Sequence, residues 1–408
     1  MTTSHARPLD ELTDLVPLSE ITGSADPKAA FARLRDRWGQ VAPVELEPGV
    51  PAWLVMGYRE IVQVSRNDRV FSRNSANWRL AEVLQNPDST VAALMTPWEH
   101  AYYADGERHR RLRAPVDDGV AGLNDHEVSR ATQAICRELI AKFEDRCEAD
   151  LVTEYAVHVP MLAVANWFGM GIDEGAQVAQ AIIQVFSADK DSQEAPETLV
   201  RLLTAHMNAH RETPGDDMTT VFLRHPSLEN DSEIMWAMIL MLAGGYEAMI
   251  SWIAQTLRVM LTDTRFSGRL RGGRLGLDDA LDEVLWRNPP WTNMPGGYAL
   301  SDTEVAGQLI RKGDAVILSF AAANLDPSVH SDDPWLEIGN RAHISYGTGP
   351  HVCPAHQPSR IIARIAVETV LTRLHDLRLA VPAGEITTMP SIWTMCPASL
   401  PVRFTGFS

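Results

Sequence analysis

The stretch Ile344-Ser-Tyr-Gly-Thr-Gly-Pro-His-Val-Cys-Pro354 places two glycines, two prolines and a histidine around Cys353. Gly347 and Gly349 allow the backbone to approach a bound group closely, and Pro354 removes a backbone donor beside the sulfur. Apolar residues recur at helical spacing over 359–374, so a helix follows the loop. A helix N-terminus stabilises a thiolate through its dipole and free N–H groups. The stretch therefore predicts a thiolate metal ligand or, as is common for a lone cysteine, a buried apolar side chain.

The composition is that of a globular chain with a large core. The chain has 408 residues, of which 45% are hydrophobic, and a formal net charge of −17. This charge argues against nucleic acids and anionic membrane surfaces as partners. Four cysteines without paired spacing, and no signal peptide, predict a cytoplasmic protein with reduced thiols. No linker divides the chain, so we expect one domain over 1–408, with an irregular N-terminal segment over 1–25.

Helical periodicity dominates the middle of the chain, and strand patterns lie near both ends. Short strands are predicted at 41–46 and 52–56, and a hairpin at 308–320 around Gly313-Asp314. The predicted helices span 126–143, 155–167, 174–186, 197–210, 219–224 and 231–262. The sequence thus predicts a mainly α fold with small β-sheets.

One helix is long and apolar enough to test whether the chain enters a membrane. Residues 234–253 carry a single charge, Glu247, over a length that could span a bilayer. Gly244-Gly245, the mid-span acid and the absence of flanking basic clusters favour a helix buried inside a large domain, with no membrane partner. A buried acid in an apolar helix is hard to explain by packing alone, which makes Glu247 a functional candidate.

A basic segment occurs at Asp105-Gly-Glu-Arg-His-Arg-Arg-Leu-Arg113. His109 and Arg113 are four residues apart, so they share a helix face and can converge on one anion. A solvated basic helix is an equally good interpretation of the residues alone. Arg110 and Arg111 are expected to face outward, where an acidic protein partner could bind them.

The order Tyr346-Gly-x-Gly-x-His-x-Cys353-Pro-Ala resembles the haem-binding loop of the cytochrome P450 family, which usually has Phe at the Tyr346 position and Gly at the position of Ala355. Further motifs follow the family order from about residue 30 to 404. The resemblance implies a helix-rich triangular prism with haem b between a long central helix and the Cys loop. It implies Cys353 as the axial iron ligand. The other implied haem contacts are Tyr346 and Gly347 in the loop, and His109, Arg113, His343 and His351 at the propionates.

Three family motifs are altered. The oxygen-side helix retains Gly244 and Glu247 but has Ala248 where the family has an alcohol that relays protons. The family's Glu-x-x-Arg becomes Glu283-x-x-Trp-Arg287, a pattern similar to that of some soluble actinobacterial members. A Glu283–Arg287 pair remains possible, because residues i and i+4 are neighbours on a helix. The basic residue that usually follows near Pro295 is absent, and Leu325 replaces the arginine of Ala-Ala-Asn-Arg-Asp-Pro.

The resemblance also implies a substrate side, formed by the irregular region 72–100, the central helix, the segment after the Glu motif and the C-terminal turn 392–395. The candidate substrate contacts are Asn77, Trp78, Leu94, Met95, Tyr246, Asn293, Met294 and Trp393. A zinc or disulfide role for Cys353 is disfavoured, because the other cysteines show no ligand spacing with it.

These implications favour an oxygen-activating haem enzyme of secondary metabolism, supplied with two electrons by a ferredoxin and its reductase and acting as a monomer on a small hydrophobic or aromatic substrate. Ala248 favours oxidative C–C or C–N coupling, for example of a tryptophan-containing cyclic dipeptide, because coupling requires no oxygen insertion. Hydroxylation or epoxidation of a small metabolite is the alternative. A haem-binding sensor without turnover is a second alternative, suggested by the altered motifs.

Overall fold

The computed structural model describes residues 7–24, 26–186, 194–263, 277–326, 328–329 and 339–405. These residues group into two compact units. The first is assigned Met1–Arg110, Trp286–Cys353 and Pro390–Met395, and the second Arg111–Leu285, Pro354–Met389 and Cys396–Ser408. The expectation that the whole chain acts as one domain stays a prediction.

The first unit is built on a six-stranded mixed sheet with the strand order β1-β2-β3-β9-β6-β4. β2 and β3 form an antiparallel hairpin, β3 pairs in parallel with β9, and β9 and β4 both run antiparallel to β6. The strands are β1 (Val16–Pro17), β2 (Val41–Glu47), β3 (Val50–Val55), β4 (Phe71–Ser72), β6 (Asn293–Ala299) and β9 (Ala315–Ser319).

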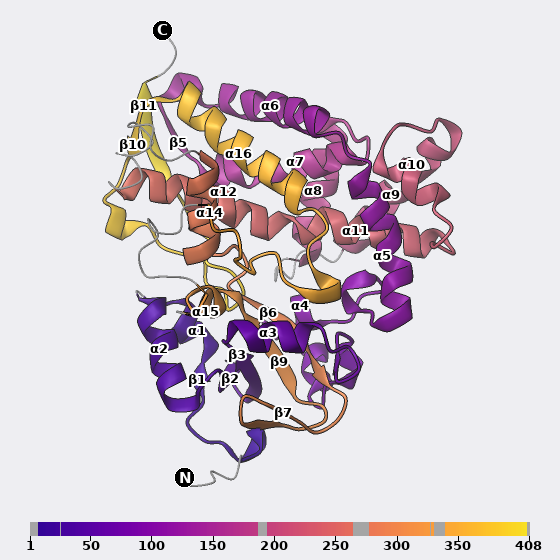
Figure 1. Cartoon of the computed structure of the whole chain (residues 1–408). Coiled ribbons are helices and arrows are strands. Elements are labelled where there is room, and N and C mark those ends of the chain that lie inside the picture. Colours follow the sequence, from indigo (N-terminus) through magenta and orange to yellow (C-terminus); the bar gives the residue numbers. More distant parts are fainter. Residues whose placement is uncertain are drawn as a thin grey trace. The chain divides into compact units, whose positions relative to one another are not determined.

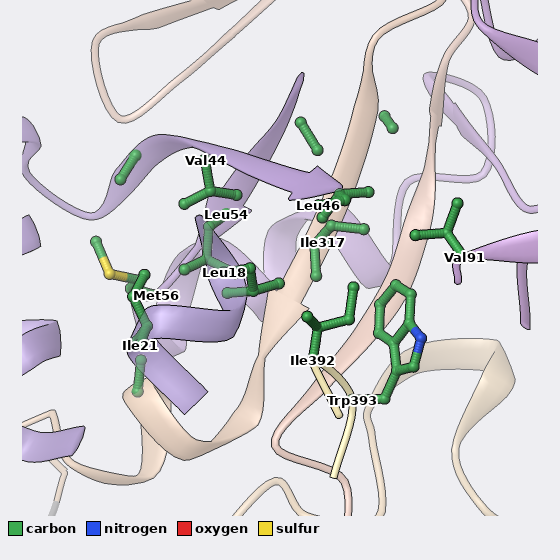
Figure 2. Close-up of a cluster of buried hydrophobic side chains, with 14 of the residues drawn as sticks. Leu18, Ile21, Val44, Leu46, Leu54, Met56, Val91, Ile317, Ile392 and Trp393 are labelled. Atoms are coloured by element: carbon green, nitrogen blue, oxygen red, sulfur yellow. The ribbon is translucent and has the colours of Figure 1, made fainter. Parts of the chain in front are cut away.

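The two faces of this sheet carry separate apolar clusters, because side chains alternate between faces along a strand. On β3, Ala52 and Leu54 pack into one cluster, and Trp53 and Val55 into the other. Figure 2 shows the first cluster, in which Trp393 of the C-terminal turn lies near Val91. Burial on both faces explains why β3 and β9, which pair in parallel, are almost entirely apolar.

The predicted hairpin over 308–320 is wrong. β8 (Gln308–Ile310) pairs with β7 (Thr303–Val305) in a separate two-stranded ribbon, and β9 joins the large sheet. The turn between β7 and β8 is Ala306-Gly307, where both residues have positive φ. Asp314 directly precedes β9. Its carboxylate accepts a hydrogen bond from the indole N–H of Trp53 at 3.0 Å and forms an ion pair with Arg79. The Gly-Asp pair therefore anchors a strand end and does not turn a hairpin.

Short helices complete the first unit, namely α1 (Leu18–Thr22), α2 (Pro27–Trp38), α3 (Tyr58–Ser65), α4 (Ala92–Met95) and α15 (Phe320–Asn324), with 3-10 turns at Leu9–Glu11, Ser75–Asn77, Ala81–Gln85, Ala101–Tyr103 and Gly349–His351. The expectation of an irregular segment over 1–25 is wrong for α1, whose Leu18 and Ile21 are buried in the core. Residues 1–6 and 25 lie outside the described residues.

The second unit is mainly helical (Figure 1), with α16 packed against α6, α7 and α12. A three-stranded antiparallel sheet of β10 (His375–Leu379), β11 (Pro401–Thr405) and β5 (Glu148–Asp150) joins it. One π-helix covers Val152–Ala156, and 3-10 turns cover Glu144–Arg146 and Ala383–Glu385. Its helices are α6 (Asp125–Ala141), α7 (His158–Trp167), α8 (Ile172–Phe186), α9 (Ala195–Glu212), α10 (Met218–Arg224), α11 (Asp231–Gly244), α12 (Tyr246–Thr262) and α16 (His356–Arg373). Helices α5 (Gly106–Ala121) and α14 (Leu277–Arg287) span the boundary between the units. The mainly α composition with small sheets is confirmed.

The long apolar helix is interrupted at Gly245, between α11 and α12. Asn230 caps α11 by accepting a hydrogen bond from the Glu233 N–H at 3.1 Å. Asp231–Thr262 as a whole is long and apolar enough to cross a membrane, and half of its most apolar window is buried by protein. The expectation of burial on all sides is therefore wrong in part.

Candidate functional site

The Cys353 loop is fixed by its own backbone. The N–H of Gly347 donates to the carbonyl of Ile344 at 2.8 Å, and the N–H of Cys353 donates to the carbonyl of Tyr346 at 2.8 Å. Gly347 has a φ of +76°, in the left-handed region that glycine tolerates best. The loop closes on itself and leaves the Cys353 side chain partly exposed and outside any disulfide.

Gly349 is required by the packing of this loop on α3. Its φ is +74°, and a Cβ at this position would lie 2.6 Å from the carbonyl oxygen of Ser65. That distance is too short for any side chain, because the obstacle is backbone. The two glycines seen in the sequence thus have different roles: one shapes the turn, and the other lets the loop approach a helix.

Asn324, at the end of α15, holds the start of the Cys loop. Its side chain accepts a hydrogen bond from the Ile344 N–H at 3.0 Å and donates to the Ser345 hydroxyl at 2.9 Å. Asn324 is fully buried, so both bonds are protected from water. The sequence showed the Ala-Ala-Asn motif without revealing this role, since the partners lie about twenty residues further along the chain.

Four of the predicted cofactor residues lie in two aromatic pairs of the first unit. The His109 and His351 rings are 4.0 Å apart, and His109 is 4% exposed. The His343 and Tyr346 rings are 5.9 Å apart. Because Tyr346 also bonds to Cys353 through the backbone, the second pair lies directly on the thiol loop.

Trp286, which occupies the motif position of the family's arginine, supports the same loop region. Its indole N–H donates to the carbonyl of Asn340 at 2.8 Å, and its ring meets the His343 ring edge-on at 5.6 Å. Trp286 is 3% exposed. The uncharged indole of Trp286, with its single N–H donor, thus packs against His343 at the position where the family has an arginine of an ion pair.

Arg113 and Arg111 lie on α5, within the second unit. Arg113 donates to the Asp117 carboxylate at 2.7 Å, one turn further along the helix. Arg111 does not face outward as expected: it makes a bidentate pair with Glu233, at 2.8 and 2.7 Å. Its role is to tie α5 to the start of α11, so a docking role for Arg111 is corrected. Arg110 is exposed.

Glu247 is exposed, so the inference of a buried acid is wrong. The break at Gly245 places Glu247 in the first turn of α12, where the helix dipole stabilises a carboxylate. Burial raises the pKa of the neighbouring Tyr246 phenol to about 12, and the charges of Glu247 and Cys396 add to this rise. Gly244 ends α11, and Ala248 offers only a methyl group on the same turn as Glu247.

Close to the predicted Glu283–Arg287 ion pair, the structure contains a second ion pair, between Asp282 and Arg360. Glu283 and Arg287 both lie on α14, one turn apart, and their pairing stays a prediction. Within the second unit Asp282, which is 5% exposed, accepts a hydrogen-bonded ion pair from Arg360 of α16. Arg360 also lies over the Trp252 ring at 5.9 Å. The ion pair that ties α14 to the helix after Cys353 is thus one residue removed from the motif.

The candidate substrate contacts differ widely in their surroundings. Trp78, Met95 and Trp393 are buried in the apolar cluster of Figure 2, and Leu94 packs against it. Asn77 is exposed and donates to the Ser72 hydroxyl at 2.9 Å, whereas Asn293 is buried and donates to the carbonyl of Ile392 at 2.8 Å. Met294 is partly buried on β6. Contact of any of them with a substrate stays a prediction.

The donor set of the first unit fits haem. A partly exposed thiol on a rigid loop can bind one axial position of iron, and imidazoles on either side of the loop suit the two carboxylates of the porphyrin. Among the described residues no cluster of three His, Cys, Asp or Glu side chains could hold a bare metal ion. A single thiol with imidazoles nearby is therefore matched to an iron whose other ligands come from a macrocycle.

The chain resembles curated bacterial enzymes along nearly its whole length, although no family model matches it. It is 27% identical over 399 residues to 2-hydroxy-5-methyl-1-naphthoate 7-hydroxylase of Streptomyces carzinostaticus, covering 94% of this chain and 96% of that protein. It is 25% identical over 409 residues to cytochrome P450-SU2 of Streptomyces griseolus, covering 99% and 100%. It is 27% identical over 378 residues to biflaviolin synthase CYP158A1 of Streptomyces coelicolor, covering 90% of each.

A solved structure has the same fold as this chain, at a sequence identity similar to that of the curated relatives. CYP154C4 from Streptomyces sp. W2061 superposes with a TM-score of 0.82 at 27% identity, covering 98% of this chain and all of that one. The resemblance spans the Cys loop, the interrupted central helix and the C-terminal strands, which confirms the fold expected from the sequence. In its thiol loop, its imidazole pairs and its sequence over nearly its whole length, the chain is similar to the haem-dependent cytochrome P450 monooxygenases.

Proposed function

We propose that this cytochrome P450 couples aromatic carbon or nitrogen atoms in a substrate such as a tryptophan-containing cyclic dipeptide. The observation that carries the proposal is the first turn of α12, where Ala248 presents a methyl group beside the exposed Glu247. Secondary metabolism is the setting of the named relatives, and one of them is a synthase. That likeness supports a role in building a natural product.

The residues that would hold the haem come from the loop and helices described above. Cys353 supplies the thiolate, with Tyr346 and Gly347 shaping its loop. We assign the carboxylates of the cofactor to imidazoles of His109, His351 and His343 and to the Arg113 guanidinium. When bound through a thiolate, haem supplies two-electron reduction of O₂ and an oxidant that can remove hydrogen from a substrate.

Coupling and hydroxylation consume the same reagents but differ in where oxygen goes. In coupling, two X–H bonds break, one C–C or C–N bond forms, and O₂ with two electrons and two protons leaves as two waters. In hydroxylation, one oxygen atom enters a C–H bond and the other leaves as water. Both need electrons from a donor, for which we propose a ferredoxin and its reductase.

The chain's own contribution on this side is control of protons. Ala248 has no hydroxyl to hold a proton or a water at this turn, and the Tyr246 phenol stays protonated at neutral pH because its pKa is about 12. Glu247 is exposed and can exchange protons with solvent. Residue 248 itself therefore contributes no group to an ordered proton path, which favours a product formed by hydrogen removal.

The proposed substrate contacts would provide an aromatic and apolar wall. Trp78 and Trp393 belong to one cluster of the first unit, and Met294 is partly buried on β6. Aromatic rings gain from stacking and edge contacts with an aromatic substrate, by about 0.5–1.5 kcal/mol each. A small hydrophobic or aromatic substrate suits such a wall.

The test is turnover of a tryptophan-containing cyclic dipeptide by the purified enzyme with ferredoxin, its reductase and ¹⁸O₂. The proposal expects a product two hydrogens lighter than the joined substrates, without ¹⁸O. A mono-oxygenated product that carries ¹⁸O as the sole product would instead establish the hydroxylating alternative, which the hydroxylase relative supports. Ferrous–CO binding without any turnover across a broad substrate library would favour the sensor, against which the enzymatic relatives argue.

Two further parts of the proposal concern the cell. We propose a monomer in the cytoplasm, consistent with four free cysteines, none of them in a disulfide. The exposed Arg110 is a candidate contact for an acidic electron donor, because steering by opposite charge speeds association.

A further inference from the structure

A buried arginine lies beside the His109–His351 pair. Arg73 directly follows β4 and is 9% exposed. Its guanidinium donates to the carbonyl oxygen of Pro295 on β6 and lies 5.5 Å over the ring of Tyr102. Among the described residues no carboxylate lies within ion-pair distance of this guanidinium. Asp105 is near, but it accepts from the backbone N–H of Arg73 at 2.8 Å and from the Ser72 hydroxyl at 2.5 Å.

The guanidinium lines a cavity of about 110 Å³ in the first unit. The two imidazoles of the pair, His109 and His351, line it too, and so does the exposed Arg110. Asp68 and Asp105 are its acidic neighbours, the former exposed to solvent. The volume exceeds the ~30 Å³ share of one water several times, so it can accept a carboxylate group.

The backbone of β6 explains why the cation comes from Arg73. β4 pairs with β6 through Ser72 opposite Tyr298, so the next residue, Arg73, lies opposite Gly297. A Cβ on Gly296 would lie 2.6 Å from Leu318 Cγ, and Gly297 has a φ of +146° with Ser72 O only 3.0 Å from its ideal Cβ. A side chain at Gly296 would clash with Leu318 and one at Gly297 with the backbone of β4, so β6 carries no side chain at these two positions.

A buried cation held only by neutral groups is unfavourable, because burial removes its hydration. The carbonyl of Pro295 and the face of Tyr102 offset part of that cost, since both are electron-rich. A carboxylate in the adjacent cavity would offset far more, through charge-assisted hydrogen bonds to the planar guanidinium. Haem brings two carboxylates, and the cavity is lined by two of the side chains proposed to bind them.

We infer that Arg73 is a haem-carboxylate ligand of this enzyme, supplying from the segment after β4 the positive charge that β6 lacks near Pro295. This inference rests on the haem cofactor and is independent of whether the product is coupled or hydroxylated. Arg73 thereby compensates for the missing basic residue of the motif. It also fixes the edge of β6 by bonding Pro295.

The test measures the cofactor directly, on holoenzyme. Haem transfer to excess apomyoglobin and the ferric/ferrous midpoint potential are compared for wild type, Arg73→Gln, Arg73→Lys and two controls. Tyr102→Phe removes the other donor to the Pro295 carbonyl, at 3.3 Å, without changing charge. Arg108→Gln removes an exposed arginine that lies on the same helix as His109 and forms an ion pair with Glu99.

The inference expects about ten- to hundredfold faster haem loss in Arg73→Gln, the effect of one charge-assisted hydrogen bond. It also expects a lower midpoint potential, because losing a cation favours the more positive ferric state. Arg73→Lys should retain most of both properties, and Arg108→Gln and Tyr102→Phe should match wild type. If Arg73→Gln keeps the wild-type haem-loss rate and potential, or if Tyr102→Phe reproduces its effects, Arg73 is only a structural brace and the inference fails. Should Arg73→Gln not fold, Arg73→Lys decides the test: haem loss more than tenfold faster than in wild type from this charge-retaining variant would overturn the inference.

Discussion

Replacing Trp286 by phenylalanine separates the hydrogen bond of this side chain from its ring packing. Phenylalanine retains a ring that can meet His343, but it leaves the Asn340 carbonyl without the indole donor now at 2.8 Å. An unmade buried hydrogen bond costs about 1–3 kcal/mol. Trp286 is only 3% exposed and Asn340 is partly exposed, so the bond is partly shielded from water, and we expect the free energy of unfolding to fall by about 2 kcal/mol. Trp286→Ala should lose about 3–5 kcal/mol, because it also leaves a cavity.

The assay is urea unfolding, followed at the Soret band for the haem pocket and by far-UV circular dichroism for the helices. With a slope of about 3 kcal/mol/M, a loss of 2 kcal/mol moves the midpoint down by roughly 0.7 M. Trp38→Phe is the matched control, since Trp38 is a partly buried tryptophan of the same unit that packs at the edge of the apolar cluster. Equal midpoints for Trp286→Phe and Trp38→Phe would refute the reasoning, as would a Trp286→Phe that matches wild type.

Three further predictions address other parts of the molecule. Arg360→Met should cost about 3–5 kcal/mol of unfolding free energy in urea titrations, because it strands the buried carboxylate of Asp282; Arg364→Met, which breaks a half-exposed pair, should cost less than about 1 kcal/mol, and equal costs would contradict the assignment. Burial lowers the pKa of His100 from 6.5 to about 4, so the unfolded state binds more protons between these values and stability falls as pH drops through them. His100→Phe should therefore remove about 2 kcal/mol of the wild-type stability difference between pH 7 and pH 5, and an unchanged difference in urea midpoints would contradict it. Ala248→Thr restores an alcohol to the first turn of α12 and should raise the ratio of mono-oxygenated to coupled product by about tenfold or more in chromatography with mass detection, whereas an unchanged ratio would show that residue 248 does not control proton delivery.

The parts of the fold that the sequence predicted are those where a local pattern decides the structure. The Cys loop has its glycines at positive φ, and the helix after it begins at His356, close to the expected start. β2 and β3 correspond to the strands predicted at 41–46 and 52–56. In each case the partner residues lie close together in the chain.

The errors have a common physical cause. The pattern around Gly313-Asp314 resembles a hairpin, but the partner of β9 is β3, more than 250 residues away in sequence. The burial of Glu247 was inferred from its apolar neighbours, and the break at Gly245 changes which helix turn carries it. Periodicity reports the average surroundings of a segment and cannot report a long-range partner or a local break.

The site shows the same division. Cys353, His351 and Tyr346 were predicted because they lie in one short motif, and the structure places the three on one loop. Arg73 carried no signal, because an arginine after a two-residue strand is ordinarily exposed. A signal existed in the Gly296-Gly297 pair, which shows that β6 can accept no side chain there and that a cation would have to come from elsewhere.

Motif departures in this chain are therefore better interpreted as relocated chemistry than as lost chemistry. Asp282 of α14 and Arg360 of α16 form an ion pair one residue removed from Glu283. The support that an arginine at position 286 would give comes from the indole of Trp286, which holds Asn340 and His343. Ala248 differs from both, because its methyl group can neither donate nor accept a proton, and the acid beside it, Glu247, is exposed. A structural contact can be made by any side chain that reaches the same atoms, whereas a proton must be delivered to the reacting atoms themselves. The uncompensated departure at residue 248 is thus the one that points to a change of reaction.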